Sequence, residues 1–588
     1  MKNIKTNWDL SLLYKNEKDP KIESDLKTAE AAYDAFGKKY STSTDYVKSE
    51  TLFAQALADY ESLYEVPAFK ALAYFRYRSD MNANDSVARA ELNLLSQRAN
   101  KNANKIVFFH VALSRIPKAQ QEKYVKSDML KFYRYFLKCI FDQSEHTLSE
   151  PEEKILNLMS LPGYALWVQG NEKIVSNQTV LWKGKKLPIN EAMSTIAVLP
   201  LQERRKLGRD LYKKLREISE FAENELNALV INKKIEDELR GYKKPYSATV
   251  LGYQNELVTV ENLVATVTRH FPMAHRFYKL KAKMLGLKKL NYVDRNTEVG
   301  KTKKKIPFEK GVEMVRAAFL KFGAEYAGIF DSFLTSGQID VFPKVGKRGG
   351  AYCSTDPKTP TFVMLNHLPD FHSVNTMAHE MGHAFHAKFS RENQKPLYQD
   401  HTISTAEVAS TLFENFVFDE VFSSLSKKEQ IVALHDKIMG SINSIFRQIA
   451  CFNFELELHN TIRVKGNLPK EEIARIMNQH MASYLGPLFN MQENEGYSFV
   501  YWSHLRNFFY VYSYAFGEII SSALYQMYKK DNSFKDKIKQ FLSSGGSDSP
   551  ENIFKSIGID VRKPGFFEEG LNKIEKDIDI LEELLKNT

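Results

Sequence analysis

The spacing of apolar residues predicts a mainly α-helical protein. From about residue 20 to residue 160, apolar side chains recur with the period of successive amphipathic helices. Helical patterns resume near residue 203 and continue from Ser404 to the end of the sequence. Pro162-Gly163 interrupts the first series, and the stretch from Trp182 to Pro188 is typical of a short hairpin. We expect a helical N-terminal domain over residues 1–195 and a second domain over residues 196–588.

Three short stretches in the second domain have the pattern of strands rather than helices. They are Ile339–Phe342, Gly350–Ser354 and Thr361–Leu365, and together they predict one small sheet. A turn at Pro369-Asp370 follows, where Asp370 or Ser373 can cap the start of a helix. We therefore expect a buried helix over residues 374–389, directly after the sheet.

That helix contains the motif His379-Glu380-Met-Gly-His383. Residues four apart lie on the same helix face, so both imidazoles can bind one metal ion, and Glu380 lies close enough to take a proton from the water on that ion. Gly382 costs about 1 kcal/mol of helix propensity relative to Ala, but it allows a neighbouring element to approach closely. The alternative is a pair of histidines with only local hydrogen bonds, which leaves a buried glutamate without a partner. The motif favours a zinc peptidase.

A third ligand has to come from another segment, and Glu407 is the first choice. It opens a second helical run together with Glu414, seven residues later on the same face, which can hold a metal-bound imidazole by its free N–H. Against this, Ser404-x-x-Glu407 is also a capping box, in which the glutamate bonds the N-cap amide. The rival ligands are His372, His386 and His401. Of these, His386 lies about 10 Å further along the helix axis than His379, too far for all three histidines to share one ion.

Composition and charge narrow the function classes. The net charge is +10, but the lysines are spread over many helices, so a solvated surface is favoured over a nucleic-acid groove. The first residues have no apolar run like that of a signal peptide. The apolar segment from Asn507 to Tyr525 contains Glu518 and several tyrosines, so we expect a buried helix and no membrane span. Three scattered cysteines favour a reducing compartment, and we expect a cytoplasmic protein.

Several segments resemble the thimet oligopeptidase family of zinc metallopeptidases, and within it the oligoendopeptidase F branch. The resemblance rests on the zinc motif followed by Ala406-Glu407-Val-Ala-Ser410, and on the upstream Gly346-Lys-Arg-Gly-Gly-Ala-Tyr-Cys-Ser354. It extends to His504-Leu-Arg-Asn-Phe-Phe-Tyr-Val-Tyr-Ser-Tyr514 and to the opening Trp8-Asp-Leu-Ser-Leu-Leu-Tyr14. The family's ligand glutamate usually precedes a Pro-Ser pair. Here Val408 and Ala409 precede Ser410, which is closer to the oligoendopeptidase branch.

The resemblance implies a zincin-type helical peptidase whose N-terminal domain encloses a substrate channel. One zinc ion per chain would be held by His379, His383 and Glu407, with Glu380 as general base. The substrates implied are short, unfolded oligopeptides cut at internal bonds. The oxyanion of the reaction needs further donors, and His504 and Tyr510 are the candidates, with Tyr514 also facing the substrate. The alternative for this aromatic segment is a plain core helix, and the choice between its tyrosines stays open.

The predicted sheet also suggests a substrate role. An extended peptide can bind by adding a strand to an exposed edge, which would involve Gly350, Ala351 and Tyr352. The alternative is a purely structural hairpin. We expect no nucleic acid, no membrane and a monomer or weak homo-oligomer. A competing class is a non-enzymatic helical peptide-binding or scaffold protein with a degenerate motif, but the intact Glu380 argues against it.

Overall fold

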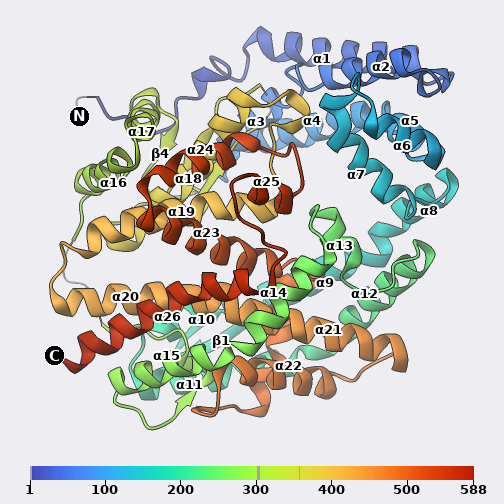
Figure 1. Ribbon diagram of the computed structural model, residues 1–588. Coiled ribbons are helices and arrows are strands. Elements are labelled where there is room, and N and C mark those ends of the chain that lie inside the picture. Colours follow the sequence, from blue (N-terminus) through green and yellow to red (C-terminus); the bar gives the residue numbers. More distant parts are fainter. Residues whose placement is uncertain (1–2, 301–304, 357, 588) are drawn as a thin grey trace. The chain divides into compact units, whose positions relative to one another are not determined.

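The computed structural model describes residues 3–300, 305–356 and 358–587. The chain is mainly α-helical, as the apolar pattern predicts (Figure 1). It forms two compact units, each assembled from three segments. The first contains residues 1–145, 304–424 and 527–559, and the second contains residues 146–303, 425–526 and 560–588. The predicted domain boundary at residue 195 lies within helix α10 of the second unit and stays a prediction.

Each unit is a helical assembly with its own core. The first unit contains α1 (Pro20–Tyr40), α2 (Glu50–Ser62), α3 (Lys70–Met81), α4 (Ser86–Asn104), α5 (Val107–Ser114), α6 (Lys118–Lys126), α7 (Arg134–Ser144), α16 (Phe308–Phe322), α17 (Ala324–Ser336), α18 (Phe371–Asn393), α19 (Ile403–Phe422), α24 (Lys535–Ser544) and α25 (Pro550–Ser556). The second unit contains α8 (Glu150–Ser160), α9 (Leu166–Ser176), α10 (Ile189–Val198), α11 (Leu201–Glu217), α12 (Ser219–Leu239), α13 (Ser247–Gly252), α14 (Leu257–Arg269), α15 (Phe271–Met284), α20 (Lys427–Ser441), α21 (Arg447–Lys465), α22 (Lys470–Leu485) and α26 (Pro564–Lys586), with most of α23 (Tyr512–Lys530).

The predicted sheet is present in the first unit and lies beside α18. It has three strands in the order β4 (Ile339–Asp340), β6 (Phe362–Met364) and β5 (Tyr352–Ser354). The central strand β6 is parallel to β4 and antiparallel to β5. All three β6 side chains are buried, whereas β5 is half-buried at the edge. The sheet therefore fixes the start of the segment that leads into α18.

The N-terminal segment anchors this sheet. The Trp8 indole is buried and donates a hydrogen bond from Nε1 to the Val363 carbonyl on β6 at 2.8 Å. Its ring also packs edge-on against Phe362, with the ring centroids 5.7 Å apart. Under the sheet, Lys347 and Asp340 form a fully buried ion pair at 2.6 Å. Burial of this kind requires paired charges, because an isolated charge in the core is strongly destabilising.

Local patterns predict some second-unit elements correctly and others not. The hairpin is confirmed as β1 (Thr179–Trp182) and β2 (Lys185–Pro188), joined by two residues with positive φ. The interruption expected at Pro162-Gly163 takes the form of a π-helical turn, Leu161–Ala165, between α8 and α9. The short parallel pair β3 (Leu290–Asn291) and β7 (Phe489–Asn490) is not predicted at all.

The segment from Asn507 to Tyr525 is helical only in part. Helix α23 begins at Tyr512, and the residues before it form an irregular turn after a 3₁₀ helix at Ser503–Arg506. Across the described ranges, no helix is both long enough and apolar enough to cross a membrane.

Candidate active site

Helix α18 carries the His-Glu-x-x-His motif and begins at Phe371, three residues before the predicted start, because Asp370 rather than Ser373 is the cap. Asp370 is its N-cap, and its carboxylate accepts the main-chain N–H of Ser373 at 2.8 Å. Met377, Met381 and Phe385 lie on one face and are fully buried. This apolar face fixes the rotation of the helix, so that His379 and His383 project together from a partly exposed face.

Gly382 sets the distance between α18 and α19. A Cβ atom at this position would lie 2.6 Å from Ser410 Cα and 2.8 Å from the Ala409 carbonyl oxygen, both on α19. No side chain other than hydrogen fits between the two helices there. The predicted close approach at Gly382 is confirmed, and it brings the first turns of α19 against the histidine-bearing part of α18.

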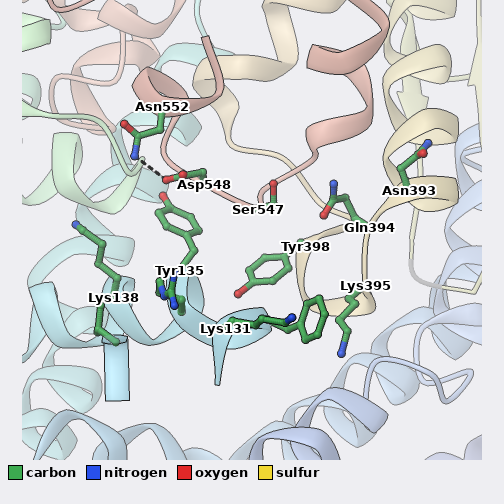
Figure 2. A pocket seen from close by; sticks show the side chains of 13 residues that line it. Lys131, Tyr135, Lys138, Asn393, Gln394, Lys395, Tyr398, Ser547, Asp548 and Asn552 are labelled. Carbon is green, nitrogen blue, oxygen red and sulfur yellow. Dashed lines mark hydrogen bonds between the residues drawn. The ribbon is translucent and has the colours of Figure 1, made fainter. Parts of the chain in front are cut away.

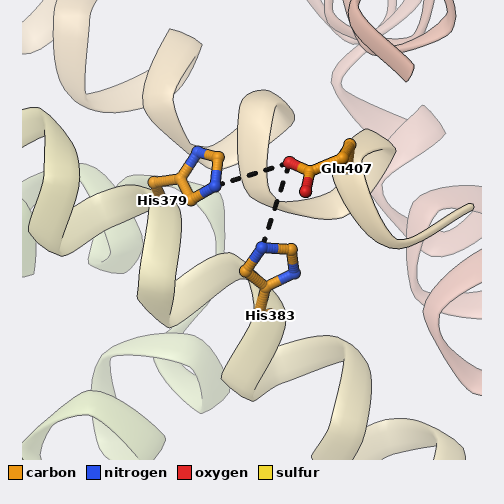
Figure 3. Close-up of side chains that lie close together, drawn as sticks. All are labelled: His379, His383 and Glu407. Atoms are coloured by element: carbon orange, nitrogen blue, oxygen red, sulfur yellow. Dashed lines mark ion pairs between the residues drawn. The ribbon is translucent and has the colours of Figure 1, made fainter. Parts of the chain in front are cut away.

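This packing brings Glu407 to the two histidines (Figure 3). The Glu407 carboxylate lies 3.5 Å from His379 Nε2 and 4.0 Å from His383 Nε2. One potential ligand atom from each residue falls within 4.8 Å of the others, and no other such group of three occurs in the described part of the chain. Ligand atoms on a tetrahedral zinc ion are about 3.3 Å apart, so these three donors match a zinc site in type and approximately in spacing.

Glu414 holds the His379 ring from the opposite side. The Nδ1 atom of His379 hydrogen-bonds to the Glu414 carboxylate, which leaves Nε2 directed towards Glu407. Burial lowers the pKa of His379, but the hydrogen bond and charge of Glu414 outweigh it and raise the pKa to about 9. At His383, burial and then the neighbouring His379 hold the pKa well below its usual value. His383 is therefore neutral, the form that binds a metal.

Glu380 is buried between α18 and strand β5. Burial is the main cause that raises the pKa of Glu380, and the charge of His379 opposes it. The charges of Glu407 and Glu414 raise the pKa further, to about 7. The main-chain N–H of Cys353 on β5 favours the ionised carboxylate. A carboxyl group with a pKa near neutrality can both accept and return a proton, which is the requirement for a general acid–base group.

The alternatives for the third ligand do not match the observed geometry. Helix α19 begins at Ile403 with Thr402 as its N-cap, so the capping box expected at Ser404 and Glu407 is not formed. The Glu407 carboxylate instead accepts a hydrogen bond from Ser410 Oγ at 3.1 Å. His386 and His401 stack on each other with ring centroids 3.9 Å apart. Neither they nor His372 belongs to the group of three potential ligands.

The predicted substrate-binding edge is only partly free. Added Cβ atoms at Gly349 and Gly350 would meet open space, as expected for an uncrowded edge. The Gly350 carbonyl, however, accepts a hydrogen bond from Asn366 Nδ2 at 2.7 Å. The Tyr352 hydroxyl donates to Asp80 at 2.6 Å, which directs its side chain to the first-unit core. Any strand added at this edge would therefore bind through the main chain of β5.

In the second unit, His504, Tyr510 and Tyr514 form one hydrogen-bonded group. The Tyr510 hydroxyl is 3.0 Å from His504 Nδ1 and 3.1 Å from the Tyr514 hydroxyl. Burial, and then the charge of Arg447, lowers the pKa of His504 to about 4. Burial and the Tyr514 contact raise the pKa of Tyr510. His504 and Tyr510 are therefore neutral near pH 7, and the Tyr510 hydroxyl can donate a hydrogen bond without a change in charge.

The turn that carries Tyr510 is strained, and sequence reasoning missed the residue that holds it. Phe508 and Phe509 have φ values of 33° and 63°, which non-glycine residues rarely adopt. The buried Glu455 carboxylate on α21 accepts the Phe509 N–H at 2.9 Å, and Thr249 Oγ1 donates to the Phe508 carbonyl at 2.8 Å. Glutamate within a helix gives no local signal of such a role.

A cavity elsewhere in the first unit contains none of the predicted site residues. It has a volume of about 540 Å³ and lies at the C-terminal end of α18 (Figure 2). Lys131, Lys138 and Tyr398 are among its lining side chains, and Asp548 bonds Asn552 at its rim. Among the described residues, the group of His379, His383 and Glu407 is the only set of three potential metal ligands, and the carboxyl group with the raised pKa beside it is Glu380.

Comparison with known proteins shows the family of the chain. The model of peptidase family M3 matches residues 200–573, a range that includes every predicted catalytic and metal-binding residue, and an oligopeptidase F model matches residues 113–177. The chain is 25% identical over 576 residues to oligopeptidase PepF of Bacillus subtilis, covering 94% of this chain and 85% of that protein. It is 24% identical over 615 residues to an oligoendopeptidase F homolog of Lactococcus lactis, covering 99% and 98%.

Solved structures show the same fold. A crystal structure from Chlamydophila abortus superposes with a TM-score of 0.85 at 23% identity, covering 98% of both chains. Oligoendopeptidase-F from Enterococcus faecium superposes with a TM-score of 0.70 at 19% identity, covering 97% of this chain and 98% of that one. The sequence-based resemblance is confirmed, and the chain is a metallopeptidase of peptidase family M3, of the oligoendopeptidase F type.

Proposed function

We propose that this metallopeptidase is a zinc-dependent oligoendopeptidase that hydrolyses internal bonds of short, unfolded peptides. The observation that carries the proposal is the group His379, His383 and Glu407, with the buried Glu380 beside it on the same helix. Two imidazoles and one carboxylate form a three-ligand set that suits catalytic zinc and leaves one position for water. One ion per chain is expected.

The metal ligands and Glu380 would have different roles in the reaction. Bound zinc would polarise the peptide carbonyl and lower the pKa of its water to about 7. Glu380 would accept the proton of that water and deliver it to the leaving nitrogen, a sequence suited to a carboxyl group with a pKa near 7. Glu414 would keep the His379 ring in its ligating orientation through the hydrogen bond to Nδ1.

His504 and Tyr510 are proposed as donors to the oxyanion, and Tyr514 as a substrate contact. Their support is the hydrogen-bonded group that they form and their resemblance to the family's segment. The main chain of Gly350, Ala351 and Tyr352 is proposed to bind the peptide backbone as an added strand, which would explain recognition of extended rather than folded substrates. The proposed partners are therefore oligopeptides.

Replacing Glu380 tests this proposal. Glu380→Gln should bind zinc and fold like the parent but lose nearly all cleavage of a quenched fluorescent peptide, because an amide cannot accept the water's proton. The matched control is Glu392→Gln on the same helix, whose exposed carboxylate pairs only with Lys388. Parental activity in Glu380→Gln, with zinc bound, would show that another group is the base.

A further inference from the structure

The second unit contains a buried cluster of two arginines and four tyrosines that the proposed mechanism does not use. We call it the Arg–Tyr cluster, made of Arg295, Arg447, Tyr278, Tyr292, Tyr484 and Tyr501. The parallel pair β3–β7 joins the segment that carries Tyr292 and Arg295 to the segment that follows Tyr484. Each arginine influences the ionisation of both Tyr278 and Tyr484, so the two guanidinium groups face the same region.

The cluster has more hydrogen-bonding capacity than partners. The side chains of Tyr278, Tyr292 and Tyr484 are fully buried. Within the described residues the Tyr292 hydroxyl has no hydrogen-bond partner, and the hydroxyls of Tyr278 and Tyr484 have at most each other. The Nε atoms of Arg295 and Arg447 are also buried and unpartnered. Nearly all buried polar atoms in proteins are paired with protein groups, water or a ligand. The unused hydrogen-bonding atoms in this region can therefore serve a bound polar group.

The cluster is also cationic. Within the described residues, no carboxylate forms an ion pair with Arg295 or Arg447, although most other buried arginines have one. Arg204 and Arg506, for example, pair with Asp294 and Glu225. The guanidinium groups lie instead over aromatic rings, with Arg295 Cζ 3.8 Å from the Tyr292 centroid and Arg447 Cζ 3.9 Å from that of Trp502. A buried Arg295 beside a half-buried Arg447, without a counter-charge, is costly, and an anion would lower that cost.

Glu495, a carboxylate whose ionisation Arg295 influences, is already engaged. Glu495 accepts the main-chain N–H of Gln492 at 2.8 Å. Burial raises the pKa of Glu495 to about 7, against the opposing hydrogen bond and the charge of Arg295. Asp294, next in the chain to Arg295, is bonded to both Arg204 and Arg205. Neither acid neutralises the pair of arginines.

The cluster lies beside the group proposed to contact the substrate. Trp502, on which Arg447 stacks, has its ring 6.3 Å from that of His504. The charge of Arg447 contributes to the lowered pKa of His504. Arg447 and Tyr501 are half-buried, so these two side chains are the solvent-facing part of the cluster. These contacts all lie within the second unit.

We propose that the Arg–Tyr cluster binds a carboxylate of the peptide substrate, an inference that rests on the proposed peptidase function. Guanidinium groups bind carboxylates through paired N–H donors, and the tyrosine hydroxyls add neutral donors to the same oxygens. A peptide has two kinds of carboxylate that could bind here: its C-terminus, or an acidic side chain within it. The cluster thus recognises the charge of the peptide, while the strand-like backbone contacts ignore its sequence.

Binding of paired peptides tests the proposal. Zinc-loaded Glu380→Gln, which cannot turn over, would be titrated with a fluorescent peptide as the free acid and as the C-terminal amide, each with or without an internal glutamate. We expect peptides that carry the recognised carboxylate to bind about tenfold to a hundredfold more tightly, as is typical of charge-assisted hydrogen bonds. Tighter binding of the free acid than of the amide would identify the C-terminus as the source of the carboxylate. Tighter binding of the peptides with an internal glutamate would identify a side chain as the source.

Variants then locate the effect. Arg447→Gln should abolish the discrimination, whereas Arg475→Gln, which removes an exposed charge paired with Glu472, should keep it. Tyr484→Phe should weaken the discrimination while leaving thermal stability nearly unchanged, because its hydroxyl has at most Tyr278 as a partner in the free protein. A hydroxyl bonded only to structural water would instead lower stability when removed and leave the discrimination intact.

The proposal is overturned if all four peptides bind equally to the parent, or if Arg447→Gln and Tyr484→Phe both keep the discrimination. These results are distinct from failure of the proposed function. If the unmutated chain showed no metal-dependent cleavage but still distinguished acid from amide, the carboxylate site would stand and the peptidase mechanism would fall. If the chain cleaved peptides normally but did not distinguish acid from amide, the peptidase mechanism would stand and the carboxylate site would fall.

Discussion

Gly382→Ala gives a quantitative test of how the fold positions the metal ligands. The added methyl would lie 2.6 Å from Ser410 Cα and 2.8 Å from the Ala409 carbonyl, both main-chain atoms of α19. Ordinary contacts begin at 3.4 Å, so α19 has to move by about 0.8 Å or α18 has to bend. Neither obstacle is a flexible side chain that can rotate away.

The expected energies separate stability from metal binding. Overpacking of a core typically costs about 1–3 kcal/mol, and alanine recovers about 1 kcal/mol of helix propensity over glycine. The net loss of stability in the metal-free protein should therefore be no more than about 2 kcal/mol. Metal–ligand distances tolerate only about 0.2 Å, so a shift of Glu407 several times larger should lower zinc affinity by about tenfold or more.

Chelator competition measures the zinc affinity, and thermal unfolding with and without zinc measures stability. The matched control is Gly328→Ala on the exposed face of α17, where an added Cβ meets nothing within 4 Å. That variant should be equally or more stable and bind zinc like the parent. If Gly382→Ala also kept the parental zinc affinity, the spacing of α18 and α19 would not determine the ligand geometry.

Two further pairs of substitutions separate the roles assigned within the site. Glu407→Ala should lower zinc affinity more than Glu414→Ala, whose loss should be about 10–100-fold because it orients His379 rather than binding the ion; chelator competition would show the reverse ranking if Glu414 were the ligand. His504→Ala and Tyr510→Phe should lower kcat more than they raise KM, with normal zinc content, because an oxyanion donor acts chiefly in the transition state. If both variants had the steady-state kinetics of the parent, this segment would have no part in the chemistry.

Features governed by neighbouring residues are predictable from this sequence. The cap at Asp370, the two-residue turn of the β1–β2 hairpin and the three strands before α18 all follow from local residue types and alternation. The consequence of Gly382 is predictable for the same reason, since a glycine inside a buried helix costs stability unless something packs against it. The fold class and the grouping of His379 with His383 belong to this set.

Features fixed by distant contacts are not predictable in the same way. Residues 507–511 have a helical apolar pattern, yet Glu455 and Thr249 hold a turn with positive φ there. Strained backbone of this kind persists only where contacts with the surrounding structure hold it in place. Likewise, Ser404 and Glu407 have the spacing of a capping box, but α19 begins earlier in the chain, at Ile403, and this leaves Glu407 free to face the histidines. The two-residue strands β3 and β7 are too short for any periodic signal.

The central claim is that His379, His383 and Glu407 hold a catalytic zinc ion. The most direct measurement is the zinc content of the purified chain by elemental analysis, paired with cleavage of a quenched peptide before chelation, after chelation and after zinc is restored. The account predicts about one zinc per chain, no cleavage by the chelated protein and recovery on addition of zinc. Undiminished cleavage by protein shown to contain no metal would contradict it.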